Sequence, residues 1–218
     1  MDKINNYNMR YLIWLVLLVR GTNLVAQESK VFKQFKEYIT GYFDNSEQVI
    51  LEIKKGQIEH PLSIHVNQII DKKIKNRPPE LSGFFLLEES YYLSPNKPLE
   101  IKPYLFFFQP TDSMHIRLAV YQIPGSINKE LIRNDNDTLQ FDFTSLQLSP
   151  TFKGATYEWN PTSKSFFTKS VNDISNGMRF TLIEYFTANE LQVMELLEKD
   201  GKRITPYETP IIYKRKNK

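Results

Sequence analysis

After residue 28 the chain opens with a stretch in which apolar residues recur at the spacing of an α-helix. Its apolar positions are Val31, Phe32, Phe35, Tyr38, Ile39 and Tyr42. Ser29 can accept a hydrogen bond at the N-terminus of such a helix, and Gly41 can end it. We therefore predict one amphipathic N-terminal helix, and no helical pattern of comparable length follows it.

The rest of the chain shows short runs in which apolar and polar residues alternate with the period of two that is typical of strands. In one run Leu62, Ile64 and Val66 alternate with Ser63, His65 and Asn67. Within residues 139–148 the phase slips by one residue near Ser145, which predicts a β-bulge. The strand candidates are 62–67, 82–92, 99–109, 114–121, 139–148, 152–159, 164–170, 178–186, 190–198 and 208–214.

The breaks between these runs contain turn residues, and Asn176-Gly177 and Asp200-Gly201 favour two-residue hairpins. About ten short strands predict a mainly β protein, either an antiparallel sandwich or a closed barrel. Residues 84–87 and 104–108 are apolar on both faces. They favour a barrel in which the helix covers one face of these strands and a filled or ligand-holding interior lies against the other.

Residues 1–27 have the layout of a secretory signal peptide. Lys3 and Arg10 precede the apolar residues 11–19, and cleavage is expected after Ala26 or Gln27. A membrane anchor would need about 20 apolar residues, and Arg20 interrupts the run. We expect residues 28–218 to be exported to the periplasm, the cell envelope or the medium, and to fold as one domain without an integral membrane segment.

The composition narrows the possible functions. With 28 basic and 25 acidic residues the net charge is +3, too small to indicate a nucleic-acid-binding face. Loss of residues 1–27 would leave about +1. The chain has no cysteine, which excludes disulfides, thiolate metal sites and a thiol nucleophile on this chain.

Several segments resemble, in order, those of the CpeT/CpcT family of phycobiliprotein chromophore lyases. The clearest is Gly41-Tyr42-Phe43-Asp44-Asn45-Ser46-Glu47-Gln48, which matches the family signature G-x-F-x-N-x-x-Q after the first helix. Partial matches are Leu87-Glu88-Glu89, Pro103-Tyr104, Val120-Tyr121-Gln122, residues 154–159 and Phe166-Phe167-Thr168. Together they cover most of residues 29–215.

The resemblance implies a calycin-like antiparallel barrel, similar to the lipocalins and often dimeric. In photosynthetic members the barrel holds a bilin, an open-chain tetrapyrrole, and delivers it to a phycobiliprotein cysteine. Here Leu105 and Phe107 replace two arginines of the family, and Ala155 replaces a cysteine. Because arginines would pair with the bilin propionates, their loss predicts a more apolar cavity. The chain cannot hold a bilin covalently through a thiol.

Aromatic residues are the strongest remaining signal, with 15 Phe, 12 Tyr and 2 Trp. Core packing alone could account for them. Alternatively some line a ligand cavity, because barrels of this size can hold one small molecule. The candidate ligand-binding residues are Glu88, Tyr91, Tyr104, Phe106, Phe108, Arg117, Tyr121 and Trp159. Arg117 could pair with a ligand carboxylate or lie on the solvent face beside His115.

The sequence shows no catalytic or metal-binding pattern. His60, His65 and His115 lack the spacing of metal ligands, and we interpret them as surface or strand-face residues. Glu88 and Glu89 are adjacent on one predicted strand, so their side chains point to opposite faces and cannot flank one bond. Residues 134–137 are interpreted as a solvated turn rather than a calcium loop.

We therefore expect an exported barrel that binds an apolar or tetrapyrrole-like small molecule without transforming it. One alternative is a bilin chromophore lyase that attaches its bilin to a phycobiliprotein cysteine. A second alternative is a ligandless envelope scaffold whose barrel interior is packed shut. A homodimer is expected from the resemblance, and no nucleic-acid partner is expected.

Overall fold

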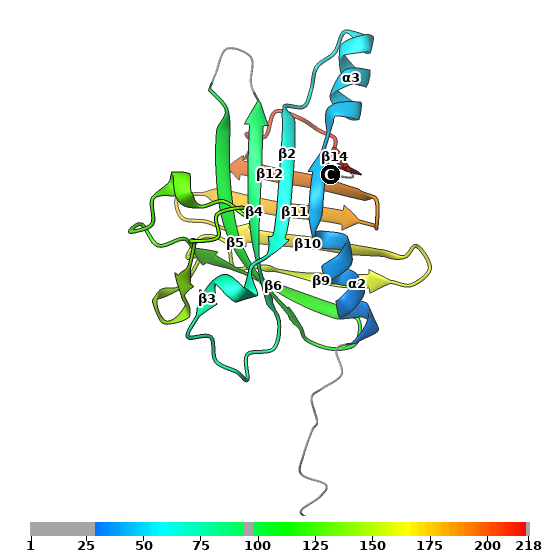
Figure 1. The fold of residues 1–218 in the computed structure, drawn as a ribbon. Coiled ribbons are helices and arrows are strands. Elements are labelled where there is room, and N and C mark those ends of the chain that lie inside the picture. Colours follow the sequence, from blue (N-terminus) through cyan, green and yellow to red (C-terminus); the bar gives the residue numbers. More distant parts are fainter. Residues whose placement is uncertain (1–28, 94–97, 217–218) are drawn as a thin grey trace, which may run out of the picture.

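The computed structural model describes residues 29–93 and 98–216. The predicted signal peptide, residues 1–27, lies outside them. The protein is mainly β (Figure 1). Its longer elements are α2 (Lys30–Ile39), β1 (Gly41–Asp44), α3 (Ser46–Lys55), β2 (Leu62–Ile69), β4 (Phe84–Leu93), β5 (Glu100–Pro110), β6 (His115–Gln122), β9 (Ala155–Asn160), β10 (Ser165–Asp173), β11 (Met178–Phe186), β12 (Glu190–Lys199) and β14 (Ile211–Lys216).

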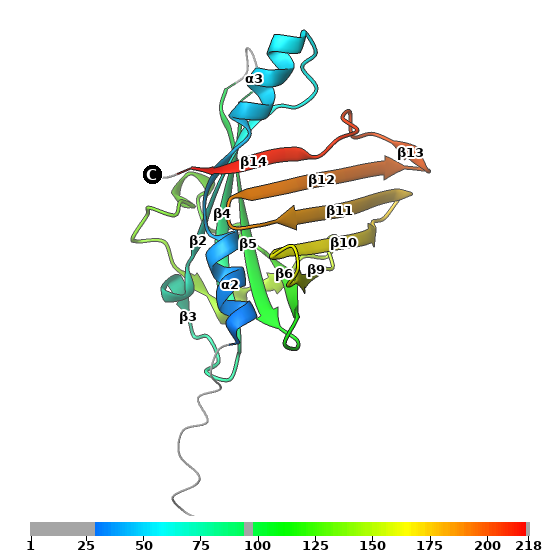
Figure 2. The same ribbon diagram turned by 90° about the vertical axis from the view of Figure 1, so that its right-hand side faces the viewer.

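Ten of these strands close into one antiparallel barrel, as predicted. Their order around the ring is β11-β10-β9-β6-β5-β4-β2-β1-β14-β12, and β12 pairs with β11 to complete it. Two groups of strands cross at a steep angle: β2, β4 and β5 run in one direction, and β10, β11, β12 and β14 run across it (Figure 2). Their inward-facing side chains meet in the interior, where the candidate site lies.

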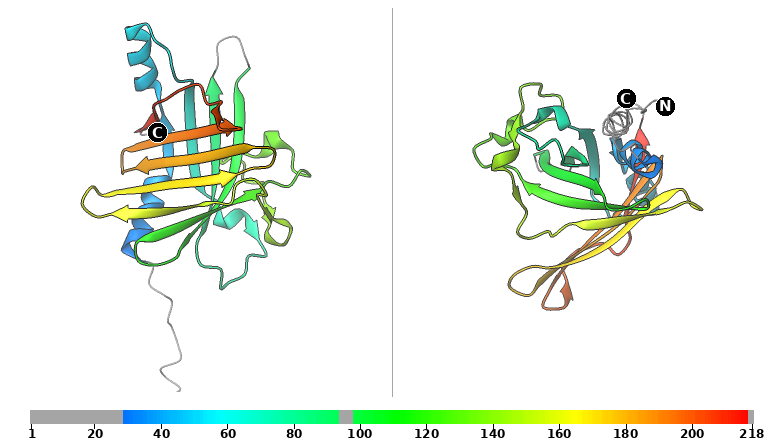
Figure 3. Two further views of the ribbon diagram at one scale, coloured as in Figure 1. Left: turned by 180° about the vertical axis from the view of Figure 1, so that it is seen from behind. Right: turned by 90° about the horizontal axis from the view of Figure 1, so that it is seen from below.

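Helix α2 forms where its periodicity predicts it. The Oγ of Ser29 accepts a hydrogen bond from the backbone N–H of Phe32 at 3.1 Å and caps the helix. The buried ring of Phe35 contacts rings from five barrel strands, namely Phe84, Phe108, Tyr157, Phe166 and Phe186. The helix therefore packs on the inner side of the barrel wall (Figure 3, right), and our expectation that it covers the outer face of residues 84–87 and 104–108 was wrong.

The outer face of β4 and β5 is covered by connecting segments instead. A buried group, here called the outer cluster, consists of Ile70, Ile74, Phe85, Leu87, Leu105, Phe107, Ile132, Leu139 and Phe141. The inner cluster contains the α2 side chains together with inward-facing residues such as Phe84, Leu86 and Phe108. The two strands are apolar on both faces because each face belongs to a different core.

The predicted strand 139–148 is wrong. Residues Phe141–Asp142 (β7) pair in parallel with Ile74–Lys75 (β3) outside the barrel, and Gln147–Leu148 (β8) pair with the end of β6. Between them lies a 3₁₀ turn, which begins where Asp142 Oδ1 accepts a hydrogen bond from Thr144 N at 3.0 Å. The phase slip near Ser145 is this turn and not a β-bulge.

The expectation of no second helix was also wrong. Helix α3 has Glu47 in its first turn, Lys54 and Lys55 in its last turn, and Gly56 at φ 72° after it, which are ordinary helix-end signals. The Asp200-Gly201 pair does form a two-residue hairpin between β12 and β13 (Lys202–Arg203). In the part of the chain that the structure describes, no helix is long and apolar enough to span a membrane.

Candidate functional site

A cavity of about 380 Å³ lies inside the barrel. Its apolar wall comes from β4, β5, β6 and β11 and includes Leu86, Phe106, Phe108, Leu118, Val120, Phe180 and Leu182. Gln122 and Thr151 also line it and are exposed, so the cavity reaches the surface at the end of β6. Pockets for small molecules have this size and this largely apolar character.

Three glutamates from three different strands line the same cavity. Glu88 lies on β4, Glu184 on β11 and Glu195 on β12. Each continues the inward-facing alternation of its strand, as Glu195 does two residues after Val193. Part of the lining is therefore acidic, and its acidic residues extend beyond Glu88, the one that the sequence predicted.

His65 on β2 forms an ion pair with Glu88. The Nδ1 of His65 lies 3.2 Å from Glu88 Oε1 without the alignment of a hydrogen bond, and Ser90 Oγ donates to that oxygen at 2.8 Å. Burial disfavours both charges, but the partner outweighs it on each side, so the pKa of His65 is raised and that of Glu88 is lowered. The pair is charged at neutral pH.

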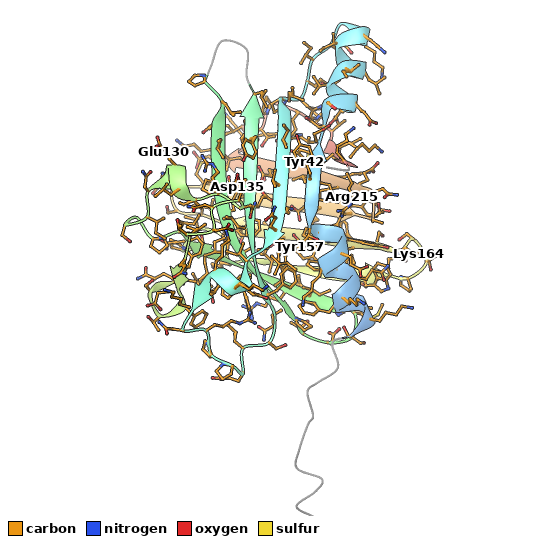
Figure 4. The ribbon with its side chains drawn as sticks, viewed as in Figure 1. Tyr42, Glu130, Asp135, Tyr157, Lys164 and Arg215 are labelled. Carbon is orange, nitrogen blue, oxygen red and sulfur yellow. The ribbon has the colours of Figure 1, made fainter. Side chains whose placement is uncertain are left out.

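Glu184 accepts a hydrogen bond from the hydroxyl of Tyr157, which lies beside α2 in Figure 4. Burial raises the pKa of Glu184 to about 7, and the nearby Glu88 and Glu195 act in the same direction. The hydrogen bond from Tyr157 opposes the shift. Glu184 therefore exchanges its proton near neutral pH.

Glu195 has no side-chain partner among the described residues, in hydrogen bonds or ion pairs. The residue is exposed, and its side chain borders the open cavity. Burial, and then the charge of Glu88, raise the pKa of its carboxyl. It is a carboxyl group that a guest could reach.

The remaining contacts of His65 connect it to Tyr213 on β14. His65 Nε2 and Ser63 Oγ both lie 2.9 Å from the Tyr213 hydroxyl. This Glu–His–Tyr–Ser series resembles a catalytic relay, but Tyr213 and Ser63 are buried and neither lines the cavity. Its role is limited to holding β2, β4 and β14 in register and to orienting His65 toward Glu88.

Of the predicted site residues, Glu88, Tyr104, Phe106 and Phe108 come together in the cavity wall. Tyr121 borders the cavity, but its ring packs on Phe85 and Phe107 in the outer cluster.

The other predicted site residues lie elsewhere. Tyr91 lies on the outer face of β4, where its hydroxyl donates to Glu89. Arg117 is exposed on the outer face of β6. Trp159 packs on Tyr38 and Phe166 in the inner cluster, away from the cavity lining.

Two sequence interpretations about this site need correction. Leu105 and Phe107, which stand at the arginine positions of the family, lie in the outer cluster, so their substitution does not make the cavity more apolar. His60 is buried outside any strand and so is neither a surface nor a strand-face residue, whereas His65 lies on the inner face of β2 and His115 is accessible beside Asp112.

Sequence reasoning missed the polar side chains of the interior, namely His65, Asn67, Tyr157, Glu184 and Glu195. In β2 the polar residues face inward and the apolar residues face outward, the reverse of the usual pattern. The available signal was the run of Ser63, His65 and Asn67 beside strands that are apolar on both faces. No group of three His, Asp or Glu side chains in residues 29–93 and 98–216 is arranged to hold a metal ion.

The fold and its interior define a class of protein, namely a closed antiparallel β-barrel with an internal cavity lined by apolar and acidic residues. No family and no curated protein compared with the chain matches its sequence. A solved structure, the CRL protein of Arabidopsis, is similar to it with a TM-score of 0.55, over 82% of this chain and 93% of that chain, at 11% sequence identity. This likeness shows a distant relation of fold.

Proposed function

We propose that the protein is a small-molecule carrier, which holds one guest with an apolar body inside its barrel and does not transform it. The single observation behind the proposal is the cavity of about 380 Å³, with a largely apolar wall and a few inward-facing polar groups. His65 and Glu88 line the cavity as an ion pair, whereas Tyr213 and Ser63 are buried away from it. The CpeT/CpcT-like segments and the distant barrel relation support a binding role for the interior.

A neutral fluorescent dye, N-phenyl-1-naphthylamine, tests this proposal. We expect saturable binding with one dye per chain. Val120→Trp places a large side chain in the cavity and should weaken binding at least roughly tenfold. Val171→Trp on the exposed face of β10 is the matched control and should bind normally. Absence of saturable binding to the folded wild-type protein would reject the carrier proposal in favour of a scaffold with a closed interior.

The bilin lyase remains the alternative that the family resemblance supplies. It predicts that a bilin incubated with this protein becomes attached to a cysteine of an acceptor phycobiliprotein. An acceptor that stays unlabelled while the dye still binds supports a carrier and argues against a lyase. Export after removal of residues 1–27, and a homodimer, are further parts of the proposal, and both can be read from the mass and the size of the protein purified from cell fractions.

A further inference from the structure

We propose that the cavity selects guests that carry a positive charge or hydrogen-bond donors, such as amphiphilic amines, and rejects anionic guests. This inference rests on the proposed carrier function and names the chemical class of its guest. Its support is the placement of the charged and polar groups of the interior.

The first support is an imbalance of charge in the lining. The cavity is lined by Glu88, Glu184 and Glu195 and by one basic residue, His65. The charge of His65 is already matched by Glu88 at 3.2 Å. Two carboxyls are therefore left without a cation, and at the half-buried Glu184 partial removal from water makes an uncompensated charge costly. A guest with a positive charge would remove this cost.

Other charged and titratable groups do not correct the imbalance. Lys102 on β5 acts on Glu195 electrostatically, but its side chain is 47% exposed and pairs with Glu100 at 3.2 Å. The other titratable groups around Glu184 and Glu195 are the tyrosines Tyr92, Tyr104, Tyr157, Tyr207 and Tyr213. The pKa of each tyrosine is raised, chiefly by burial, so all stay neutral.

The second support is independent of the carboxyls. Asn67 on β2 lines the cavity, is 1% exposed, and its Oδ1 has no hydrogen-bond partner. Its amide nitrogen donates to the carbonyl of Ile39 at 3.0 Å, which fixes the side chain. A buried acceptor without a hydrogen-bond donor is rare in native proteins, so we expect a donor to be supplied to it. Donors on a guest would satisfy both this oxygen and the carboxylates.

The apolar wall requires the rest of the guest to be hydrophobic. Phe106, Phe108 and Leu118 line the cavity beside the polar groups. The fitting molecule therefore has an apolar body and a cationic or donor-rich end. Fatty acids and bilins carry carboxylates, and like charges near Glu184 and Glu195 would disfavour them. The inference therefore disfavours, as guests, the tetrapyrroles that the family resemblance suggests.

The test compares three guests with the same ten-carbon tail: decanol, decyltrimethylammonium and decanoate. Each displaces the bound neutral dye at pH 8, below the concentration at which it forms micelles. We expect the cation to bind roughly tenfold more tightly than the alcohol, and decanoate to bind roughly tenfold more weakly than the alcohol. Equal affinities, or a preference for decanoate, overturn the inference while leaving the carrier function intact. Failure of the dye and of all three guests to bind rejects the carrier function itself.

Single substitutions test whether the cavity glutamates cause the preference for a cation. Glu184→Gln and Glu195→Gln keep the size of the side chains and should each reduce binding of the cation about five- to tenfold, with binding of decanol within twofold of wild type. Glu158→Gln, on the exposed outer face of β9, removes the same charge from the molecule and should change nothing. Equal effects of the three substitutions would mean that net charge, and not the cavity, attracts the cation.

The pH dependence gives a further check. Decyltrimethylammonium does not titrate, so any change comes from the protein. Its affinity should rise between pH 6 and 8 as Glu184 and Glu195 lose their protons, and the rise should be smaller in Glu184→Gln. An affinity that falls over this range contradicts the inference.

Discussion

The two faces of β4 and β5 carry two different kinds of core. On the outer side Phe85, Leu87, Leu105 and Phe107 are almost fully buried against the connecting segments. On the inner side, beyond the fully packed Phe84 and Phe108, the same strands present the half-buried Phe106, Glu88 and a cavity. One pair of strands thus combines a close-packed core with an incompletely filled one.

The polar groups of the two sides differ in the same way. Glu89 on the outer side accepts hydrogen bonds from the Tyr91 hydroxyl and from Asn134 N, so its carboxylate is satisfied within the fold. On the inner side the carboxyl of Glu195 and the Oδ1 of Asn67 have no hydrogen-bond partner among the described residues. Stability accounts for the outer arrangement. The inner arrangement lowers stability, as expected if the cavity serves the proposed binding role.

The largest expected effect compares neighbouring phenylalanines on β5. Phe107→Ala should destabilise the protein by about 4 kcal/mol, because it opens a void in the close-packed outer cluster. Phe106→Ala should cost only about 1 to 2 kcal/mol, because Phe106 is half-buried and already borders a cavity. Urea unfolding measures both. Equal costs would show that the two cores are packed alike.

Removal of His65 should have the next largest effect. His65→Ala leaves Glu88 buried without its cation and should destabilise the fold by about 3 kcal/mol. The pKa of Glu88 should rise at the same time, because the charge that most strongly opposes the effect of burial is lost. His115→Ala, in which an accessible histidine leaves Asp112, should change stability by less than about 0.5 kcal/mol. Thermal unfolding of both variants decides the comparison.

The pH dependence of stability should differ between wild type and Glu184→Gln. A carboxyl whose pKa is about 7 when folded and near 4.5 when unfolded holds its proton more tightly in the folded state. Its ionisation therefore destabilises the fold progressively as pH rises from about 4.5 through 7. Glu184→Gln should gain about 2 kcal/mol relative to wild type between pH 5 and pH 8. A constant difference across this range would contradict a raised pKa for Glu184.

The smallest effects come from two tyrosine hydroxyls that donate to glutamates on opposite sides. Tyr157→Phe and Tyr91→Phe should each cost about 1 kcal/mol. Only Tyr157→Phe should also shift the pH dependence of stability to higher pH, because the lost hydrogen bond favours the ionised form of Glu184. Unfolding measured at several pH values separates the two variants.

The barrel could be predicted because most of its strands have clear turns and a period of two. The exceptions have physical reasons. Residues 139–148 alternate like a strand, but Asp142 caps a 3₁₀ turn within them. Strand β1 has only four residues and directly follows α2, so it gives no periodic signal. The helical pattern of α3 is weak because Ile50, Leu51 and Ile53 are all exposed.

The cavity wall was only partly predictable. The long apolar run of β5 indicated Tyr104, Phe106 and Phe108, and alternation assigned Glu88 and Glu89 to opposite faces. Nothing in the sequence singled out Glu184 and Glu195, since charged side chains on a strand most often face solvent. Their inward position depends on the register of β11 with β12, which pairs Leu182 with Glu195 and Glu184 with Val193, and one strand alone does not fix it.

The place of β14 in the ring determines when the barrel can close during synthesis. β14 lies between β1 and β12, and the side chain of Arg215 binds the carbonyls of Thr40 and Tyr38 at the end of α2 (Figure 4). Until residues 211–216 have been made, β1 and β12 each lack a neighbour and expose an unpaired edge, which is a template for aggregation. A nascent chain of this protein therefore remains incompletely folded until nearly all of the barrel sequence has emerged. Until then it can unfold, be threaded as an extended chain and bind chaperones.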